Sequence, residues 1–212
     1  MQNPVSIKVN NAGKKFGKEW IFRKVNEEIA PGEKLVVLGL NGSGKSTLLQ
    51  AFTSFLTLNE GEAAYFHDQV PIATEHIYKY ISVASPYLEL VEDFTLQEQI
   101  EHASQFKPFL HPLTNAEVIR LSGLSAHTGK FIRLFSSGMK QRLKLTLAIL
   151  ADAPVLFLDE PTTNLDATVV DWYKQLIAQY AMHKTIIVCS NSIKDEYGFC
   201  DRTLVMEDYK NS

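Results

Sequence analysis

Three short apolar runs constrain the fold of this chain more than any other feature. They cover residues 34–39, 154–159 and 185–190, and each is rich in leucine or β-branched residues without polar alternation. Strands that are buried on both faces of a parallel sheet have this pattern. Helical segments lie between the runs, so the sequence predicts an α/β fold with a mostly parallel core sheet.

The segments around these runs add detail to the predicted fold. Residues 5–9 and 20–29 alternate apolar and polar side chains, which predicts an N-terminal antiparallel β section, and residues 202–206 fit a last strand. Thr-x-x-Glu sequences begin at Thr95 and Thr114 and match the capping box of a helix start. We therefore expect one domain over residues 1–212, with an inserted helical subdomain at about residues 90–136.

The segment Gly39-Leu-Asn-Gly-Ser-Gly-Lys-Ser46 fits the pattern G-x-x-x-x-G-K-[ST] between a predicted buried strand and a predicted helix. In such a loop, glycines let successive backbone N–H groups face phosphate oxygens, and the helix N-terminus adds its positive end. Lys45 would place a cation on the phosphates, and the Ser46 hydroxyl would ligate Mg²⁺. A glycine-rich turn without a ligand is the alternative. The residues predicted to bind phosphate are Gly39, Asn41, Gly42, Ser43, Gly44, Lys45, Ser46 and Thr47.

Two carboxylates follow the second apolar run, in Leu156-Phe-Leu-Asp-Glu160. Ligands of open α/β sheets bind at the carboxyl ends of the strands. We expect Asp159 to hold Mg²⁺ through its water shell, and Glu160 to orient and deprotonate an attacking water. The alternative is a solvated strand end.

Further motifs resemble a known family. Phe135-Ser-Ser-Gly-Met-Lys-Gln-Arg142 precedes the carboxylates, and Thr162-Thr-Asn-Leu-Asp166 follows them. Together they resemble the signature motif, Walker B motif and D-loop of the ATP-binding cassette (ABC) ATPases, and the resemblance extends over essentially the whole chain. It implies a P-loop NTPase fold, ATP and Mg²⁺ as cofactors, and a nucleotide held between two subunits arranged head to tail.

The resemblance also implies roles for single residues. Ser136 and Gly138 would contact the γ-phosphate held by the partner subunit, Asp166 would line the same interface, and Phe16 would stack on adenine. Three of these residues have a structural alternative, because Ser136 and Asp166 also suit helix N-caps and an aromatic residue such as Phe16 after a strand is often a core residue.

Departures from the family pattern predict slow hydrolysis. Ser85 and Pro86 stand where the family usually has a glutamine, and Asn191 stands where it has a histidine. Asn191 is expected to act in catalysis by donating a hydrogen bond, but an amide does not carry a proton as imidazole does. Loss of one preorganised donor typically lowers a rate about 10²–10³-fold. Because Lys45 and Glu160 remain, we predict an ATPase that is slow.

Composition limits the partners. The chain has 21 Lys and Arg against 24 Asp and Glu, so we expect no nucleic-acid partner. The sequence shows no secretory signal and no apolar run near the length of a membrane span, which predicts a cytoplasmic protein. The two cysteines, Cys189 and Cys200, have neither disulfide nor zinc-site spacing.

The first hypothesis is the ATP-binding subunit of an ABC transporter, on the inner face of the cell membrane through a multi-span permease subunit. The cassette would pair as a homodimer or as a heterodimer with another ABC subunit. Residues 86–94 contain Glu89, Glu92 and Asp93; we expect them at the docking groove, where they would favour a basic amphipathic partner helix. A solvated acidic loop is the alternative there.

Other functions remain open. A soluble ABC-type ATPase and a nucleotide-gated scaffold with little hydrolysis are both compatible with the motifs. A kinase of the phosphate-loop class would leave the signature motif and the D-loop unexplained.

Overall fold

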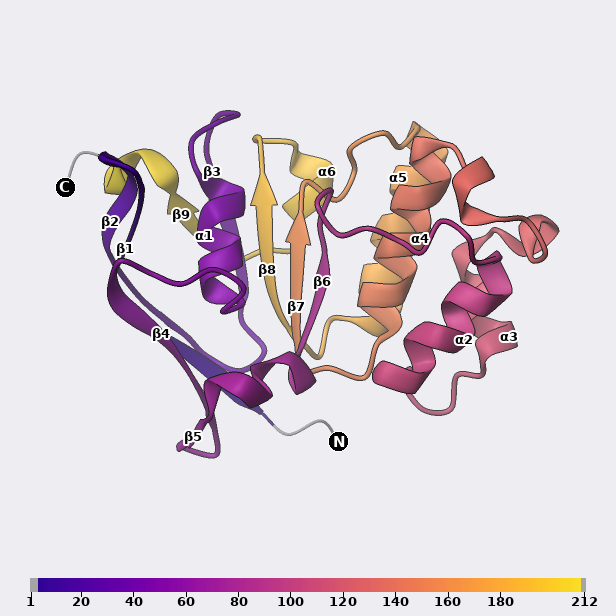
Figure 1. Ribbon diagram of the computed structural model, residues 1–212, viewed down its shortest axis with the longest axis horizontal. Coiled ribbons are helices and arrows are strands. Elements are labelled where there is room, and N and C mark those ends of the chain that lie inside the picture. Colours follow the sequence, from indigo (N-terminus) through magenta and orange to yellow (C-terminus); the bar gives the residue numbers. More distant parts are fainter. Residues whose placement is uncertain (1–3, 211–212) are drawn as a thin grey trace.

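Two β-sheets organise the chain, of which this computed structural model describes residues 4–210 (Figure 1). The core sheet is parallel throughout and has the order β6-β7-β8-β3-β9. Its strands are β3 (Lys34–Leu38), β6 (Ile81–Ala84), β7 (Val155–Asp159), β8 (Thr185–Ser190) and β9 (Arg202–Val205). The α/β prediction is therefore confirmed, and the three apolar runs form β3, β7 and β8 in the middle of this sheet.

The core strands bury both faces, which explains their continuous apolar sequence. In β7, Leu156 and Leu158 pack into one hydrophobic core, while Phe157 between them packs into another. Because side chains alternate between the faces of a strand, a strand covered on both sides needs apolar residues at every position.

The second sheet is antiparallel, with the order β2-β1-β4-β5. Its strands are β1 (Val5–Phe16), β2 (Glu19–Ile29), β4 (Glu60–His67) and β5 (Val70–Ile72). The first two confirm the predicted antiparallel section. The pattern analysis missed β4 and β5 because only Tyr65 among their residues is fully buried, which leaves little alternation.

Helices cover the sheets in layers (Figure 1). The helices are α1 (Lys45–Phe52), α2 (Leu96–Phe106), α3 (Asn115–Ser122), α4 (Ser137–Leu150), α5 (Ala167–Tyr180) and α6 (Lys194–Tyr197). Short 3-10 helices cover Thr74–Lys79, Ser125–His127, Ile132–Leu134 and Met206–Tyr209. Helix α1 lies between the two sheets, α4 and α5 cover the other face of the core sheet, and α2 and α3 lie outside them.

Local capping follows the sequence. Thr95 and Thr114 each form a complete capping box, at the starts of α2 and α3. Asp166 caps α5 by accepting a hydrogen bond from the backbone N–H of Val169 at 3.0 Å. In the described part of the chain, no helix combines the length and the apolar character of a membrane span.

The topology places the predicted site at one edge of the core sheet. Parallel strands end at the same edge, and Asp159 at the end of β7 lies opposite Cys189 in β8, while Leu38 at the end of β3 lies opposite Ser190. The phosphate loop, the two carboxylates and Asn191 therefore all follow strands that end together at the top of Figure 1.

Candidate functional site

The phosphate loop connects β3 to α1 with a backbone that requires glycine. Gly44 is the N-cap of α1 with a φ of 100°, and a Cβ atom there would lie 2.4 Å from Ile21 Cγ2. A Cβ atom on Gly39 would lie 2.4 Å from Ser43 Oγ. Because Gly44 supplies no capping side chain, the first N–H groups of α1 receive no side-chain cap. Such an uncapped N-terminus is suited to an anion.

A pocket of about 350 Å³ opens at this loop. Its lining residues are Ile21, Asn41, Gly42, Gly44, Lys45, Ser46, Thr47, Tyr87 and Glu160. The structure thus brings most of the predicted phosphate-binding residues together with Glu160. Gly39 and Ser43 do not line the pocket. Phe16 is exposed and also lies outside the lining, with the Lys14 ammonium 5.2 Å from the centre of its ring.

Lys45 is almost fully buried at the base of the pocket. Its Nζ donates hydrogen bonds to the carbonyl oxygens of Gly39 at 2.8 Å and Leu40 at 3.1 Å. The same Nζ lies 3.7 Å from Glu160 Oε1. The loop therefore holds the ammonium between its own carbonyls and the carboxylate at the end of β7, beside the uncapped helix start.

Asp159 carries an oxygen that needs a further partner. The residue is 1% exposed, and its Oδ2 accepts a hydrogen bond from Ser85 Oγ at 3.3 Å, while Oδ1 is buried without a hydrogen-bond partner. Burial raises the pKa of Asp159, with the neighbouring Glu160 carboxylate acting in the same direction and the nearby Ser46 hydroxyl in the opposite one. A buried carboxylate oxygen without a partner, next to a serine hydroxyl, is a donor set that fits Mg²⁺.

Glu160 leaves the line of β7 through an unusual backbone conformation. Its φ is 45°, in the left-handed region that non-glycine residues rarely adopt. Its backbone N–H donates to the carbonyl oxygen of Cys189 at 2.9 Å, which fixes the turn against β8. The turn directs the side chain to the pocket, where it is 31% exposed and so accessible to water.

A buried glutamate that the motifs did not indicate supports this edge of the sheet. Glu196 of α6 is 0% exposed, and its Oε1 accepts hydrogen bonds from the Thr162 backbone N–H at 3.1 Å and from Thr162 Oγ1 at 2.8 Å. Its Oε2 accepts one from Ser190 Oγ. Glu196 thereby ties the loop after Glu160 to the end of β8, and burial raises its pKa. Asn191, the residue after β8, is exposed and does not line the pocket.

The residues of the signature motif lie apart from the phosphate loop. Ser136 caps α4, and its Oγ accepts a hydrogen bond from the Met139 backbone N–H at 3.2 Å. Gly138 packs so closely that a Cβ atom would lie 2.9 Å from the carbonyl oxygen of Asn164. Together with Asp166 at the start of α5, these residues form a second group of helix N-termini, and none of them lines the pocket of its own chain.

Sequence reasoning missed two lining residues, Ile21 and Tyr87. Ile21 lies in β2, and Tyr87 lies in the loop after β6, next to the Ser85 and Pro86 that replace the family's usual glutamine. The motifs indicated neither side chain. Tyr87 is a large aromatic residue that is 70% exposed, but its sequence neighbours did not indicate the pocket that it faces.

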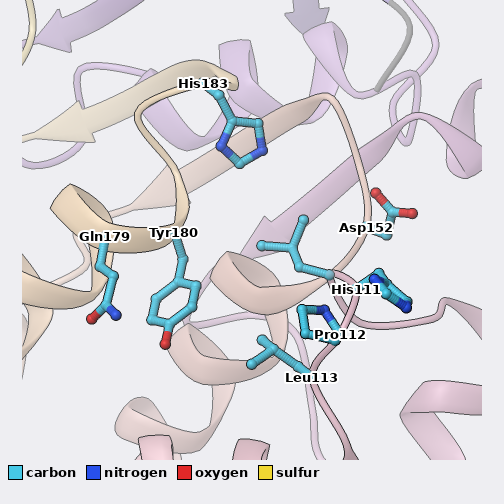
Figure 2. A pocket seen from close by; sticks show the side chains of 8 residues that line it. His111, Pro112, Leu113, Asp152, Gln179, Tyr180 and His183 are labelled. Atoms are coloured by element: carbon cyan, nitrogen blue, oxygen red, sulfur yellow. The ribbon is translucent and has the colours of Figure 1, made fainter. Parts of the chain in front are cut away.

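A separate hollow lies at the opposite edge of the core sheet, where β7 and β8 begin. It has a volume of about 440 Å³, and Figure 2 shows the His183 ring on one side of it and Tyr180, Pro112 and Leu113 on another. It contains none of the predicted site residues. The candidate site is therefore the pocket at the phosphate loop.

Comparisons with known proteins agree with this geometry. Nod factor export ATP-binding protein I of Burkholderia orbicola is 28% identical over 207 residues, which span 95% of this chain and 68% of that protein. The uncharacterized ABC transporter ATP-binding protein YdbJ of Bacillus subtilis is 26% identical over 209 residues, which span 98% of this chain and 68% of that protein.

Solved structures share the fold. A putative ABC transporter ATP-binding protein from Pyrococcus furiosus superposes with a TM-score of 0.79 at 18% identity, covering 97% of this chain and 100% of that one. The dimeric structure of MJ0796, a bacterial ABC transporter cassette, superposes with a TM-score of 0.78 at 23% identity, covering 94% and 93%. The sequence model of the family described as ABC transporter matches residues 22–163. Since this match extends over well above half of the sequence, the chain belongs to the ABC transporter family.

Proposed function

We propose that this chain is the ATP-binding and ATP-hydrolysing subunit of an ABC transporter that energises transport through separate membrane subunits. The observation that carries the proposal is the pocket itself, where an uncapped helix start and the buried Lys45 ammonium lie beside the Glu160 carboxylate, directly after Asp159 with its unpartnered buried oxygen. These groups match a nucleoside triphosphate with its magnesium ion.

Each group has a defined task in this proposal. The N–H groups of the loop and of α1 bind the phosphates, and Lys45 adds a positive charge beside them. Ser46 and Asp159 hold Mg²⁺, which when bound offsets negative charge on the phosphates. Glu160 accepts a proton from the attacking water and orients it.

ATP turnover is slow in this proposal because the side chains at the positions of the family's glutamine and histidine are not available as hydrogen-bond donors to the phosphate. The Ser85 hydroxyl donates to Asp159 and does not line the pocket. Asn191 cannot carry a proton, and it does not line the pocket within its own chain either.

A second ATP-binding subunit would complete the site. The N-terminus of α4, with Ser136 exposed and Gly138 packed on Asn164, is free to face a phosphate held by another cassette. Asp166 lies at the neighbouring start of α5 and would line the same interface. Both a homodimer and a heterodimer fit this arrangement, and Phe16 would contact the base.

An apolar groove offers a place for the membrane subunit. It has a volume of about 350 Å³ and lies between β6, α2 and α4. The most exposed of its apolar side chains are Phe106 at 75%, Phe55 at 58% and Tyr78 at 55%. We propose that it accepts the apolar face of an amphipathic helix from a membrane subunit, since exposed aromatic patches of this kind mark interaction sites.

Two of the acidic residues in the segment 86–94 form ion pairs with basic residues of the chain itself. Glu92 pairs with Lys140 at 2.6 Å, and Asp93 pairs with Arg133 at 2.5 Å. Most of the acidic charge of residues 86–94 is therefore neutralised within the chain. The basic helix expected from the sequence stays a prediction, and the apolar groove adds apolar contact as a requirement on the partner.

The catalytic half of the proposal is tested by phosphate release from Mg-ATP. We expect slow release by the wild-type chain and a rate at least about 10-fold lower for Glu160→Gln, which loses the proton acceptor. Glu62→Gln, an exposed carboxylate on β4, is the matched control and should retain the wild-type rate. Equal rates for wild type and Glu160→Gln would refute hydrolysis by this site.

The transport half is tested by recovery of the chain from membranes of its native host. Phe106→Glu places a charge in the apolar groove, and we expect it to abolish co-purification with the membrane fraction. Val70→Glu changes an apolar side chain on β5 that is 64% exposed and does not line the groove, and it should have no effect. Equal recovery of both variants would contradict docking at the groove.

A further inference from the structure

Tyr87 lies in the nucleotide pocket and directly follows Ser85 and Pro86, which stand where the ABC family usually has a glutamine. It follows β6, is 70% exposed, and lines the pocket together with Lys45, Ser46 and Glu160. Among the described residues that line this pocket, Tyr87 alone is aromatic. Because Tyr87 is so exposed, core packing does not explain a tyrosine in a pocket that also contains a buried ammonium and a carboxylate.

The strand order shows which end of the pocket Tyr87 approaches. Strand β6 is the neighbour of β7, which carries Glu160, and lies on the side of β7 away from β3. Ile21 reaches the pocket from β2, in the antiparallel sheet. Tyr87 therefore enters from the side of Glu160, where the terminal phosphate and the attacking water would meet.

Hydrogen bonds hold the backbone of this loop against the carboxylate of Asp159. The Tyr87 backbone N–H donates to Ser85 Oγ at 3.4 Å, and the same hydroxyl donates to Asp159 Oδ2 at 3.3 Å. Lys144 Nζ of α4 donates to the carbonyl oxygens of Ser85 at 3.4 Å and Pro86 at 3.1 Å. The start of the Tyr87 side chain is thus fixed relative to the metal-holding residue.

The phenol supplies a neutral hydrogen-bond donor from the β6 side of the pocket, in addition to the Lys45 ammonium and the hydroxyls of the phosphate loop. Ser85 uses its hydroxyl on Asp159, and Glu160 as a carboxylate only accepts. We infer that the Tyr87 hydroxyl donates a hydrogen bond to the terminal phosphate of bound ATP and thereby acts as a catalytic residue. This inference rests on the proposed function, because it needs ATP in the pocket. A neutral donor stabilises charge on the phosphate as the reaction proceeds without changing the charge of the site.

Removal of the hydroxyl alone tests the inference. We expect Tyr87→Phe to lower the rate of phosphate release about 10- to 100-fold, at or below the usual range for a lost donor because the side chain is exposed. The affinity for Mg-ADP should stay within about threefold of wild type, since ADP lacks the terminal phosphate. Tyr180→Phe, on α5 and outside the pocket, is the matched control and should match the wild-type rate.

A binding measurement separates this inference from the question of hydrolysis. In a Glu160→Gln background, we expect Tyr87→Phe to reduce the preference for Mg-ATP over Mg-ADP about 3- to 10-fold, the range of one hydrogen bond. Titration calorimetry of both nucleotides measures this preference. If wild type and Glu160→Gln release phosphate equally, the proposed hydrolysis fails, yet the binding preference still decides the role of Tyr87.

Two results would overturn the inference. One is an unchanged preference for ATP over ADP in Tyr87→Phe. The other is a Tyr87→Phe chain with the wild-type rate of phosphate release, together with a Tyr87→Ala chain that binds ATP and ADP equally less tightly. That pair of results would show that the ring packs on the base or ribose and that the hydroxyl has no role.

Discussion

Replacement of Asp159 by asparagine is expected to stabilise the chain without nucleotide and to weaken its response to Mg-ATP. The wild-type carboxylate is 1% exposed, with Oδ1 buried and unpartnered. An unsatisfied buried polar group costs about 1–3 kcal/mol, and more when it is charged. Asparagine removes the charge, and its carbonyl oxygen still accepts the hydrogen bond from Ser85.

The neutral amide leaves an N–H₂ group in the place of Oδ1, so only part of the cost is recovered. We expect Asp159→Asn to raise the free energy of unfolding by about 1–2 kcal/mol. For a chain of this length, that corresponds to a rise in Tm of about 2–8 °C.

With ligand, the order of stability should reverse. A ligand at 100 times its Kd stabilises the folded state by about 2.7 kcal/mol, provided that it binds only that state. The wild-type chain should gain this amount from Mg²⁺ and a non-hydrolysable ATP analogue, whereas Asp159→Asn should gain much less because a metal ligand is lost. Thermal unfolding followed by circular dichroism, with and without Mg²⁺ and the analogue, measures both effects.

The control is Asp171→Asn, an exposed aspartate of α5, which should change stability by less than about 0.5 kcal/mol in either condition. The reasoning is refuted if Asp159→Asn destabilises the nucleotide-free chain, or if it gains as much stability from the Mg²⁺ complex as the wild type does.

Three further perturbations test the packing around the site. Glu196→Ala removes the acceptor of three buried hydrogen bonds and should lower the free energy of unfolding in urea by about 2–4 kcal/mol, whereas Glu196→Gln should cost less than half as much. Gly138→Ala places a Cβ atom 2.9 Å from the carbonyl oxygen of Asn164 and should lower stability by about 1–3 kcal/mol, visible as a lower Tm. Burial lowers the pKa of Lys184 from 10.5 to about 7, so the unfolded chain binds more protons between these values and stability should rise with pH there. Lys184→Met should reduce this slope by up to about 1.4 kcal/mol per pH unit in urea titrations at pH 7.5, 8.5 and 9.5.

Each of these expectations has an outcome that contradicts it. Equal stability of Glu196→Ala and Glu196→Gln would show that the carboxylate position does not hold the two loops together. A Gly138→Ala chain as stable as wild type would mean that the contact with Asn164 relaxes freely. An unchanged pH slope in Lys184→Met would assign the slope to other groups, such as Lys107, whose pKa burial lowers to about 8.

The sequence predicted those strands, helix starts and loops whose pattern lies within a few neighbouring residues. The three apolar runs became β3, β7 and β8, and the capping boxes at Thr95 and Thr114 began helices as expected. The phosphate loop formed between a strand and a helix because glycine allows the local backbone, such as the φ of 100° at Gly44. By contrast, β4 and β5 gave no pattern, since the antiparallel sheet leaves most of their side chains partly exposed.

Residues of the site that are distant in sequence could not be predicted in this way. Glu196 holds Thr162 across 34 positions, and Tyr87 meets Lys45 and Glu160 only because β6 pairs with β7. The roles of Ser136 and Asp166 towards a partner subunit, inferred from the family resemblance, are still predictions.

The acidic segment 86–94 shows most clearly what the sequence predicts and what the tertiary structure decides. The sequence alone determined that acidic groups would lie in this segment, just as it determined the apolar strands, the helix caps and the glycine-lined loop, because each depends on side chains within one turn or one strand. Only the tertiary structure decided that Lys140 and Arg133 would pair with Glu92 and Asp93, and that Asp159 Oδ1 would be buried without a hydrogen-bond partner. Coulomb energy and desolvation depend on distance in space and on exclusion of water, and both are set by how distant segments pack.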